Sequence, residues 1–192
     1  MMQNIHFKAP NCWINDPNGF IWYKGQYHLF YQCFPYAPQW GRMHWGHAVS
    51  KDLINWEKKG IALYPTKIDD RSGCFSGSAV EQDRTLYLFY TGVNYLEENP
   101  EDINQCRNDQ FLAAQMMISS DDGMTFDNVK RKKTVIPPIT EKQIGSKTNT
   151  RDPKVWRGKD AWYLVLGSSV DHKGRLLIIK AMIFRIGRIS AT

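Results

Sequence analysis

Short apolar runs alternate with polar positions along the whole chain, and sustained helical periodicity is nearly absent. The runs are rich in aromatic and β-branched residues and are separated by Gly, Asp and Asn, a pattern typical of strands joined by turns. The predicted strands are 19–23, 26–31, 44–50, 56–63, 76–80, 85–90, 111–119, 129–136, 152–156, 161–166 and 175–180. The pattern therefore predicts an all-β fold.

The predicted strands group into units of about four, which restart at Asp16, Ser76 and Asp152. A repeated four-stranded unit indicates a β-propeller, in which each unit is one blade around a central channel. We therefore expect three such units. The repeat places Asp152 at the position of Asp16, and inner strands of a propeller start near the channel, so both carboxylates are expected to face one pocket.

A shared turn supports this division into blades. The third strand of the first unit runs into Ser50–Glu57, and that of the second unit runs into Ser119–Phe126. Each segment has a serine, an acidic turn and an aromatic residue that opens the outer strand. Ser and Asp side chains in such turns accept hydrogen bonds from backbone N–H groups. The alternative is two unrelated polar loops.

The third unit lacks this turn, because the segment 181–192 has no acidic residue and no aromatic opener. Codons for Lys-Ser-Asn-Asp-Phe-Gln-Asn-Trp-Lys, a good match to the expected turn, yield Lys180–Arg188 after deletion of one nucleotide. The hypothesis is a frameshift near Lys180. Residues 1–180 are then a partial N-terminal propeller, and 181–192 form an out-of-register tail. Sequencing of the coding DNA tests this idea.

Composition excludes several classes of protein. The chain has 192 residues, of which 42% are hydrophobic and 23% charged, which is typical of a globular protein and not of a disordered one. No apolar run reaches the roughly 18 residues that a membrane span needs. Met1–His6 shows no basic region followed by an apolar stretch, so no secretory signal is expected. A cytoplasmic protein without a membrane partner is the resulting expectation.

Charge and cysteines add little. The net charge of +6 comes from scattered residues, and the one cluster, Lys130–Lys133, is expected to be a solvated loop or strand edge, so nucleic acid is not an expected partner. The cysteines are widely spaced, which favours free thiols in a reducing compartment. His44 and His47 point to opposite faces of a strand and would chelate a metal poorly. We expect no metal and no cofactor.

The densest chemical signal is Trp13–Gly19, with the sequence W-I-N-D-P-N-G. A proline after Asp16 holds this aspartate extended at a strand start, and Asn18–Gly19 is expected to turn the chain. A carboxylate held there near aromatic rings is a candidate nucleophile. The plainer interpretation is a turn with capping residues. The second candidate is Asp152, between Arg151 and Pro153.

These blocks resemble those of glycoside hydrolase family 32, the invertases, fructan hydrolases and sucrose-6-phosphate hydrolases. Besides W-I-N-D-P-N-G, the similar blocks are F-Y-Q-C-F-P at 30–35, W-G-R-M-H-W-G-H-A at 40–48, F-S-G-S at 75–78, Y-T-G at 90–92 and R-D-P-K-V-W at 151–156. The second and third blocks look most like the bacterial sucrose-6-phosphate hydrolase branch. The resemblance implies a five-bladed propeller followed by a β-sandwich, of which this chain holds only the first two to three blades.

The resemblance also implies a mechanism and its residues. Family members retain configuration through a covalent fructosyl-enzyme. Asp16 would be the nucleophile, and Asp152 would stabilise the transition state, with Arg151 keeping the carboxylates ionised. The remaining implied substrate contacts are hydrogen bonds from Asn15, Gln32 and Ser76 and apolar faces from Trp40 and Phe75.

One implied component is absent from these 192 residues. The acid/base of the family is a Glu in a W-E-C-P block, and no such block is found. Loss of that role lowers the rate about 100- to 10,000-fold. The resemblance thus predicts a hydrolase of sucrose, sucrose 6-phosphate or fructo-oligosaccharides in a truncated, inactive form. The alternatives are a fructoside-binding remnant without catalysis and a functionless truncated product.

Overall fold

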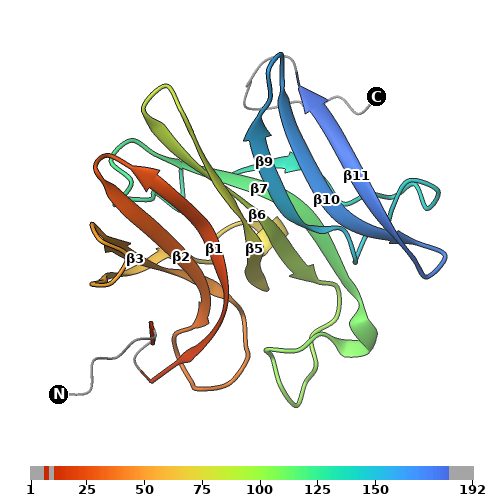
Figure 1. Ribbon diagram of the computed structural model, residues 1–192. Coiled ribbons are helices and arrows are strands. Elements are labelled where there is room, and N and C mark those ends of the chain that lie inside the picture. Colours follow the sequence, from red (N-terminus) through yellow and green to blue (C-terminus); the bar gives the residue numbers. More distant parts are fainter. Residues whose placement is uncertain (1–6, 9–10, 182–192) are drawn as a thin grey trace.

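Three antiparallel sheets lie next to one another in chain order (Figure 1). They are seen in a computed structural model, which describes residues 7–8 and 11–181. The first sheet, blade 1, has the order β1-β2-β3-β4 and consists of β1 (Trp13–Tyr23), β2 (Gln26–Phe34), β3 (His44–Ser50) and β4 (Glu57–Leu63).

The second sheet, blade 2, has the order β5-β6-β7-β8, and the third, blade 3, has the order β11-β10-β9. Blade 2 consists of β5 (Gly73–Gln82), β6 (Thr85–Tyr95), β7 (Phe111–Ser120) and β8 (Lys133–Ile136). Blade 3 consists of β9 (Arg151–Arg157), β10 (Trp162–Val170) and β11 (Lys173–Ala181). The helices of the described residues are two short 3-10 turns, η1 (Ile68–Asp70) and η2 (Arg107–Asp109). The predicted all-β fold, with its restarts, is confirmed.

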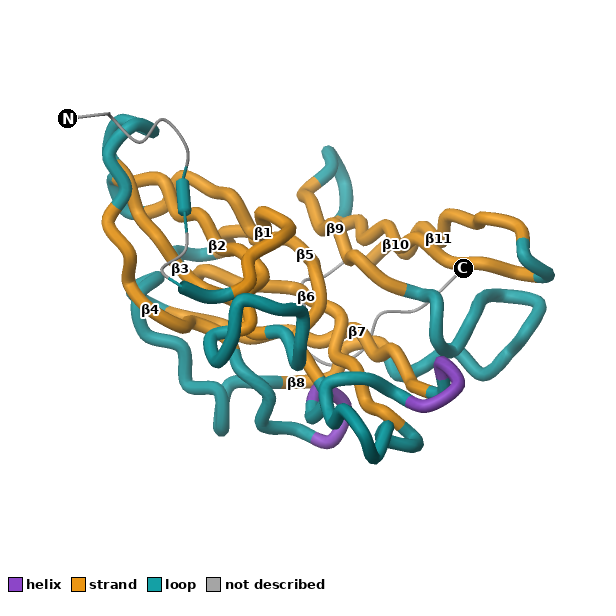
Figure 2. Tube along the Cα trace, turned by 90° about the horizontal axis from the view of Figure 1, so that it is seen from below, coloured by secondary structure: helices purple, strands orange, loops and turns teal. Residues whose placement is uncertain are grey.

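The first strand of each blade is its inner strand. β5 packs against both β1 and β9, although these strands are far apart in the sequence. Figure 2 shows β1 and β5 on one side of their sheets and β4 and β8 on the other. The residues at the starts of β1, β5 and β9 are thereby brought to the same end of three neighbouring inner strands.

Blade 2 is buried on both faces. Leu88 and Tyr90 of β6 belong to the core shared with blade 1, together with Phe30 and Trp45. The residue between them, Phe89, belongs to the core shared with blade 3. Successive side chains of a strand point to opposite faces, so a continuous apolar run is what a strand between two neighbours requires.

The two predicted serine–aspartate turns form as expected. The Oγ of Ser50 accepts the backbone N–H groups of residues 52 and 53, and the Oδ1 of Asp52 accepts those of 54 and 55. In blade 2 the matching acceptors are Ser120 and Asp122, so the equivalent serine is Ser120 rather than Ser119. These hydrogen bonds to backbone N–H groups lower the pKa of both Asp52 and Asp122, although burial opposes the shift at Asp122.

The outer strand of blade 2 is shorter than predicted, because only Lys133–Ile136 of the expected 129–136 is a strand. Asp127 Oδ1 accepts the N–H groups of Val129 and Lys130, which turns the chain. Asn128 reaches instead to blade 1, where it donates to the Ala62 carbonyl and accepts the N–H of Tyr64. Local side-chain bonds thus replace the ladder bonds of a strand.

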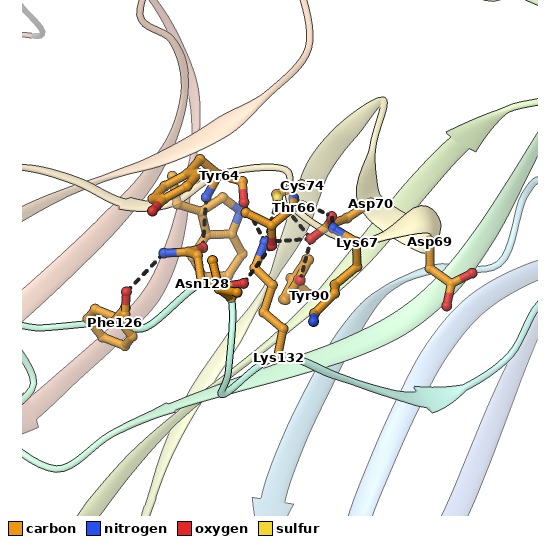
Figure 3. Close-up of polar contacts among 12 residues, drawn as sticks. Tyr64, Thr66, Lys67, Asp69, Asp70, Cys74, Tyr90, Phe126, Asn128 and Lys132 are labelled. Carbon is orange, nitrogen blue, oxygen red and sulfur yellow. Dashed lines mark hydrogen bonds and ion pairs between the residues drawn. The ribbon is translucent and has the colours of Figure 1, made fainter.

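A buried ion pair lies at the same junction (Figure 3). Lys132 Nζ is 2.5 Å from Asp70 Oδ2, and both side chains are fully buried. Lys132 also donates to the Tyr64 carbonyl, and Tyr90 donates its hydroxyl to Asp70 at 2.8 Å. The expectation that Lys130–Lys133 is a solvated cluster is therefore wrong for Lys132, which ties blade 2 to the connection between blades.

No helix in the described residues is long and apolar enough to cross a membrane. All four cysteines are free thiols. The tail predicted for 181–192 lies, apart from Ala181 at the end of β11, outside the described residues.

Candidate active site

The inner strand of every blade carries the same irregularity near its start. In each case one extra residue bulges out, so that two residues of the inner strand oppose one of the next. The opposed sets are Asn15 and Asp16 against Gln32, Phe75 and Ser76 against Thr91, and Asp152 and Pro153 against Leu166.

These bulges hold most of the residues singled out from the sequence, and they correct two expectations. Asp16 is not at a strand start, because β1 already begins at Trp13. Counted from the last paired residue before each bulge, Asp152 is level with Asn15 and one residue before the position of Asp16. Bulges redirect side chains next to active sites, so the same device recurs where the chemistry is expected.

Asp16 and Ser76 meet across the junction between blades 1 and 2. The Oγ of Ser76 donates to Oδ2 of Asp16 at 2.6 Å. Asp16 is exposed, and within the described residues no hydrogen bond engages its Oδ1. Ser76, predicted as a sugar contact, thus orients the candidate nucleophile, and the free oxygen remains open to a substrate.

Asn15 is held by its neighbours on both sides. Its Oδ1 accepts from Trp13 Nε1 at 2.9 Å, and its Nδ2 donates to Gln32 Oε1 at 2.6 Å. Gln32 is buried, so it lies behind Asn15 as seen from solvent. These two bonds fix the amide orientation of Asn15 at the bulge.

Asn18 and Gly19 do not turn the chain, because β1 continues through them to Tyr23. Gly19 takes φ +51° at a second irregularity of the strand, a conformation that favours glycine. Asn18 is buried, and its Oδ1 accepts the N–H of Gly77 on β5 at 3.1 Å. The motif therefore bends the inner strand and joins it to the next blade.

Asp152 has an unusual backbone. Its φ is +62°, in the left-handed region, although a residue that precedes a proline is usually extended. Its N–H donates to Thr91 Oγ1 at 3.0 Å, and Thr91 in turn donates to the buried Gln115 at 2.8 Å. Strained backbone held by a buried network is found preferentially at functional sites.

The pKa of Asp152 is raised above its usual value. Burial is the main cause, the charge of Arg151 opposes it, and the nearby charge of Asp16 adds to it. Arg151 thus favours the ionised carboxylate, as expected, but burial has the larger effect on this pKa. The guanidinium of Arg151 donates to Asn149 Oδ1 at 2.7 Å. The two aspartates are thus close enough for the charge of Asp16 to affect the carboxyl of Asp152.

An open cleft of about 490 Å³, called the first cleft below, lies next to this site, since its lining includes Phe75 and Arg151. Three predicted residues line it: Trp40, Phe75 and Arg151. Trp40 and Phe75 meet edge to face with ring centroids 6.2 Å apart. The other predicted residues, including both aspartates, do not line this cleft.

Sequence reasoning did not identify several residues that line the first cleft. They come from the end of β6, the polar loop after it, the start of β7 and the segment before β9: Tyr95, Gln105, Cys106, Asp109, Phe111, Thr148 and Asn149. Asp109 adds a carboxylate and has φ +52°. An irregular loop has no periodicity, so its sequence gives no signal for which side chains point inward.

Comparison with known proteins identifies the family of this chain. Residues 6–183 match the model of the glycosyl hydrolases family 32 N-terminal domain. The chain is 43% identical over 172 residues to a sucrose-6-phosphate hydrolase of Zymomonas mobilis, covering 88% of this chain and 30% of that protein. It is 38% identical to the Bacillus subtilis sucrose-6-phosphate hydrolase, covering 92% of this chain and 33% of the relative.

Solved structures give the same result. A family 32 β-fructofuranosidase of Bombyx mori superposes with a TM-score of 0.75 at 38% identity, covering 92% of this chain and 34% of that one. The chain thus spans about a third of the length of the relatives that it matches. With a family match over nearly all of its residues, the chain belongs to glycosyl hydrolase family 32, and its three sheets are part of that family's N-terminal β-propeller domain.

Proposed function

We propose that the chain provides the fructosyl-binding part of a β-fructofuranosidase site for sucrose or sucrose 6-phosphate. The observation that carries the proposal is the hydrogen bond between Ser76 and Asp16, made between the bulges of two blades, with Asp152 close by. Named relatives support the substrate class, since they include sucrose-6-phosphate hydrolases and a Bombyx mori variant in complex with sucrose.

The proposed chemistry starts at the free oxygen of Asp16. Oδ1 attacks the anomeric carbon of the fructosyl unit, the bond to the leaving-group oxygen breaks, and that oxygen takes up a proton from an acid. Water then hydrolyses the fructosyl ester and restores the carboxylate. Asp152 accepts hydrogen bonds from fructosyl hydroxyls as positive charge develops on the ring.

None of the residues that the bulges bring together is assigned the role of the acid that protonates the leaving-group oxygen. These 192 residues contain no W-E-C-P block, so the proposal assigns sugar binding to this chain and efficient turnover to a chain that includes that glutamate. Asp109 lines the first cleft but comes from an irregular loop, and we give it no role in proton transfer.

Calorimetric titration with fructose, sucrose and glucose tests the proposal. Fructose and sucrose should bind, glucose should bind more weakly, and Asp16→Asn and Ser76→Ala should each weaken fructose binding. Release of reducing sugar from sucrose, measured in parallel, distinguishes binding alone from hydrolysis. Equal binding of glucose and fructose would refute the proposal. Absence of a cooperative thermal transition would favour a functionless product.

A further inference from the structure

Two buried hydroxyl groups of blade 2 bind the strand that carries Asp152. Thr91 lies in the Y-T-G block on β6, and Ser78 ends the F-S-G-S block on β5. Their exposed fractions are 0% and 5%, so neither side chain is open to a substrate. β5 and β6 both contact β9, on which Asp152 lies. The two hydroxyls therefore act on β9 rather than on a ligand.

The hydroxyls bind the backbone at the bulge of β9. Asp152 and Pro153 form this bulge, where the ladder between β9 and β10 is interrupted. Thr91 Oγ1 accepts the N–H of Asp152 at 3.0 Å. Ser78 Oγ donates to the Pro153 carbonyl at 2.8 Å and accepts the N–H of Val155 at 3.1 Å. Blade 2 thus supplies hydrogen-bond partners for the backbone on both sides of the Asp152 side chain.

The hydrogen bonds behind Thr91 run in a single direction. Gln115 Nε2 donates to the Thr150 carbonyl at 2.9 Å, because a carbonyl only accepts. Gln115 Oε1 therefore faces Thr91 and takes its hydroxyl proton at 2.8 Å. With that proton used, Thr91 Oγ1 accepts from Asp152. Gln115 and Thr150 are each only 1% exposed, so the protein and not solvent sets the orientation of the Thr91 hydroxyl.

The backbone of Asp152 needs such support. A φ of +62° is rarely adopted by a residue with a side chain, and it persists only where the surrounding structure imposes it. Thr150, two residues earlier, is fixed as well, since its Oγ1 lies 2.6 Å from Ser168 Oγ on β10. The direction of a side chain follows from its backbone. The bonds to Thr91 and its neighbours therefore determine where the Asp152 carboxylate points.

We propose that Thr91, supported by Gln115 and Ser78, positions the carboxylate of Asp152 for the fructosyl unit without touching the sugar. The inference rests on the proposed function, which assigns Asp152 to the fructosyl hydroxyls. Without the Thr91 hydroxyl the N–H of Asp152 loses its acceptor. The backbone then relaxes toward the extended conformation that is usual before a proline, and the carboxylate turns away from its place in the site.

Thr91→Val tests this role, because it removes the hydroxyl and keeps the shape of the side chain. Calorimetric titration should show fructose binding about tenfold weaker than in the native chain. The second measurement is the pKa of Asp152, from carbon-13 NMR of the aspartate carboxyls, assigned with Asp152→Asn. The protein around Asp152 raises this pKa, Arg151 opposes the shift and Asp16 adds to it. A carboxyl released by Thr91→Val should titrate closer to its usual value.

Two further variants show whether the hydroxyl itself is responsible. Thr91→Ser keeps the acceptor and should restore both fructose binding and the raised pKa. Gln115→Met removes only the group that orients the hydroxyl, so it should change both quantities in the same direction as Thr91→Val but less. If Thr91→Val does not fold, Gln115→Met decides the question.

Thr66→Val is the matched control, because it removes a hydroxyl that donates to the Asn128 carbonyl at the junction of blades 1 and 2. It should lower the melting temperature and leave fructose binding and the pKa of Asp152 unchanged. If Thr91→Val does the same, the positioning role is overturned and the proposed function stands. A pKa change that Thr91→Ser reverses, in a chain that does not bind fructose, would support the positioning role and refute the proposed function.

Discussion

Two clusters in this chain each combine aspartate with a basic residue, but they differ in how many of their polar atoms are hydrogen-bonded. The buried cluster joins Lys132 and Asp70 between blades 1 and 2, and the open cluster joins Asp16, Asp152 and Arg151 at the inner strands. In the buried cluster both oxygens of Asp70 are engaged, since Oδ1 accepts two backbone N–H groups and Oδ2 accepts Tyr90 and Lys132.

The open cluster uses only part of its hydrogen-bonding capacity. Asp16 accepts one bond, from Ser76, and within the described residues the carboxylate of Asp152 accepts none. Arg151 is directed to Asn149 instead of forming an ion pair. The difference distinguishes two uses of charge: a cluster whose polar atoms are all engaged stabilises the fold, and one with free polar atoms is the candidate for binding a ligand.

The largest effect is expected from breaking the buried pair. Lys132→Met leaves a buried carboxylate without its cation, which should lower the free energy of unfolding by about 3–5 kcal/mol. Urea denaturation followed by tryptophan fluorescence measures it. Addition of Asp70→Asn should recover part of the loss, and a single-variant effect below about 1 kcal/mol would contradict the assigned role.

As the pH falls, we expect the buried histidines to lower the stability of the fold before the open cluster does. Burial, with the charges of His28 and Lys59, lowers the pKa of His47 to about 3, and His47 lies 3.0 Å from His28. Between pH 6.5 and 3 the unfolded chain binds this proton and the folded chain does not. Stability is therefore present above pH 6.5 and falls on acidification by up to roughly 1.4 kcal/mol per pH unit.

Denaturation curves at several pH values test this prediction. His47→Gln should flatten the fall in stability below pH 6.5, whereas His172→Gln, in the exposed β10–β11 turn, should not. Identical pH profiles for the native chain and His47→Gln would show that other groups cause the acid sensitivity.

A change in the open cluster should affect binding more than folding. Asp152→Asn is expected to weaken fructose binding about tenfold or more, through the loss of charge-assisted hydrogen bonds. Its folded-state pKa is raised, so the ionised carboxylate destabilises the fold at neutral pH, and the variant should be as stable as the native chain or slightly more stable. Calorimetry and thermal melts measure both effects, with Asp171→Asn in an exposed turn as the control.

The smallest effect is expected at an exposed ion pair. Lys180 and Asp160 lie 2.8 Å apart, with side chains 40% and 58% exposed. Solvent and salt screen such pairs, so Lys180→Met should leave the denaturation midpoint almost unchanged. A loss comparable to that of Lys132→Met would mean that burial does not distinguish the two ion pairs.

Much of the architecture could be predicted, because it depends on local sequence patterns. Alternation gave the strands, the restarts gave the blades, and the serine–aspartate turns formed as expected at Ser50 and Asp52. The outer strand of blade 2 was predicted too long, because Asp127 and Asn128 bind the backbone and the neighbouring blade, which periodicity does not reveal.

The candidate site, too, could be predicted only in part. Motif resemblance named Asp16, Ser76 and Asp152, but the three bulges, the bond from Ser76 to Asp16 and the left-handed backbone of Asp152 depend on how strands pair. A bulge adds one residue to a register, and the register is defined only once two strands face each other.

The sequence by itself determined the class of fold, the number of units and the family, since each depends on residue types at fixed spacing along the chain. Only the tertiary structure decided which charges are buried. Lys132 looks like its solvated neighbours in the sequence, and its partner Asp70 lies 62 residues away. The free energy of a buried charge depends on that partner, which the fold supplies and local sequence does not.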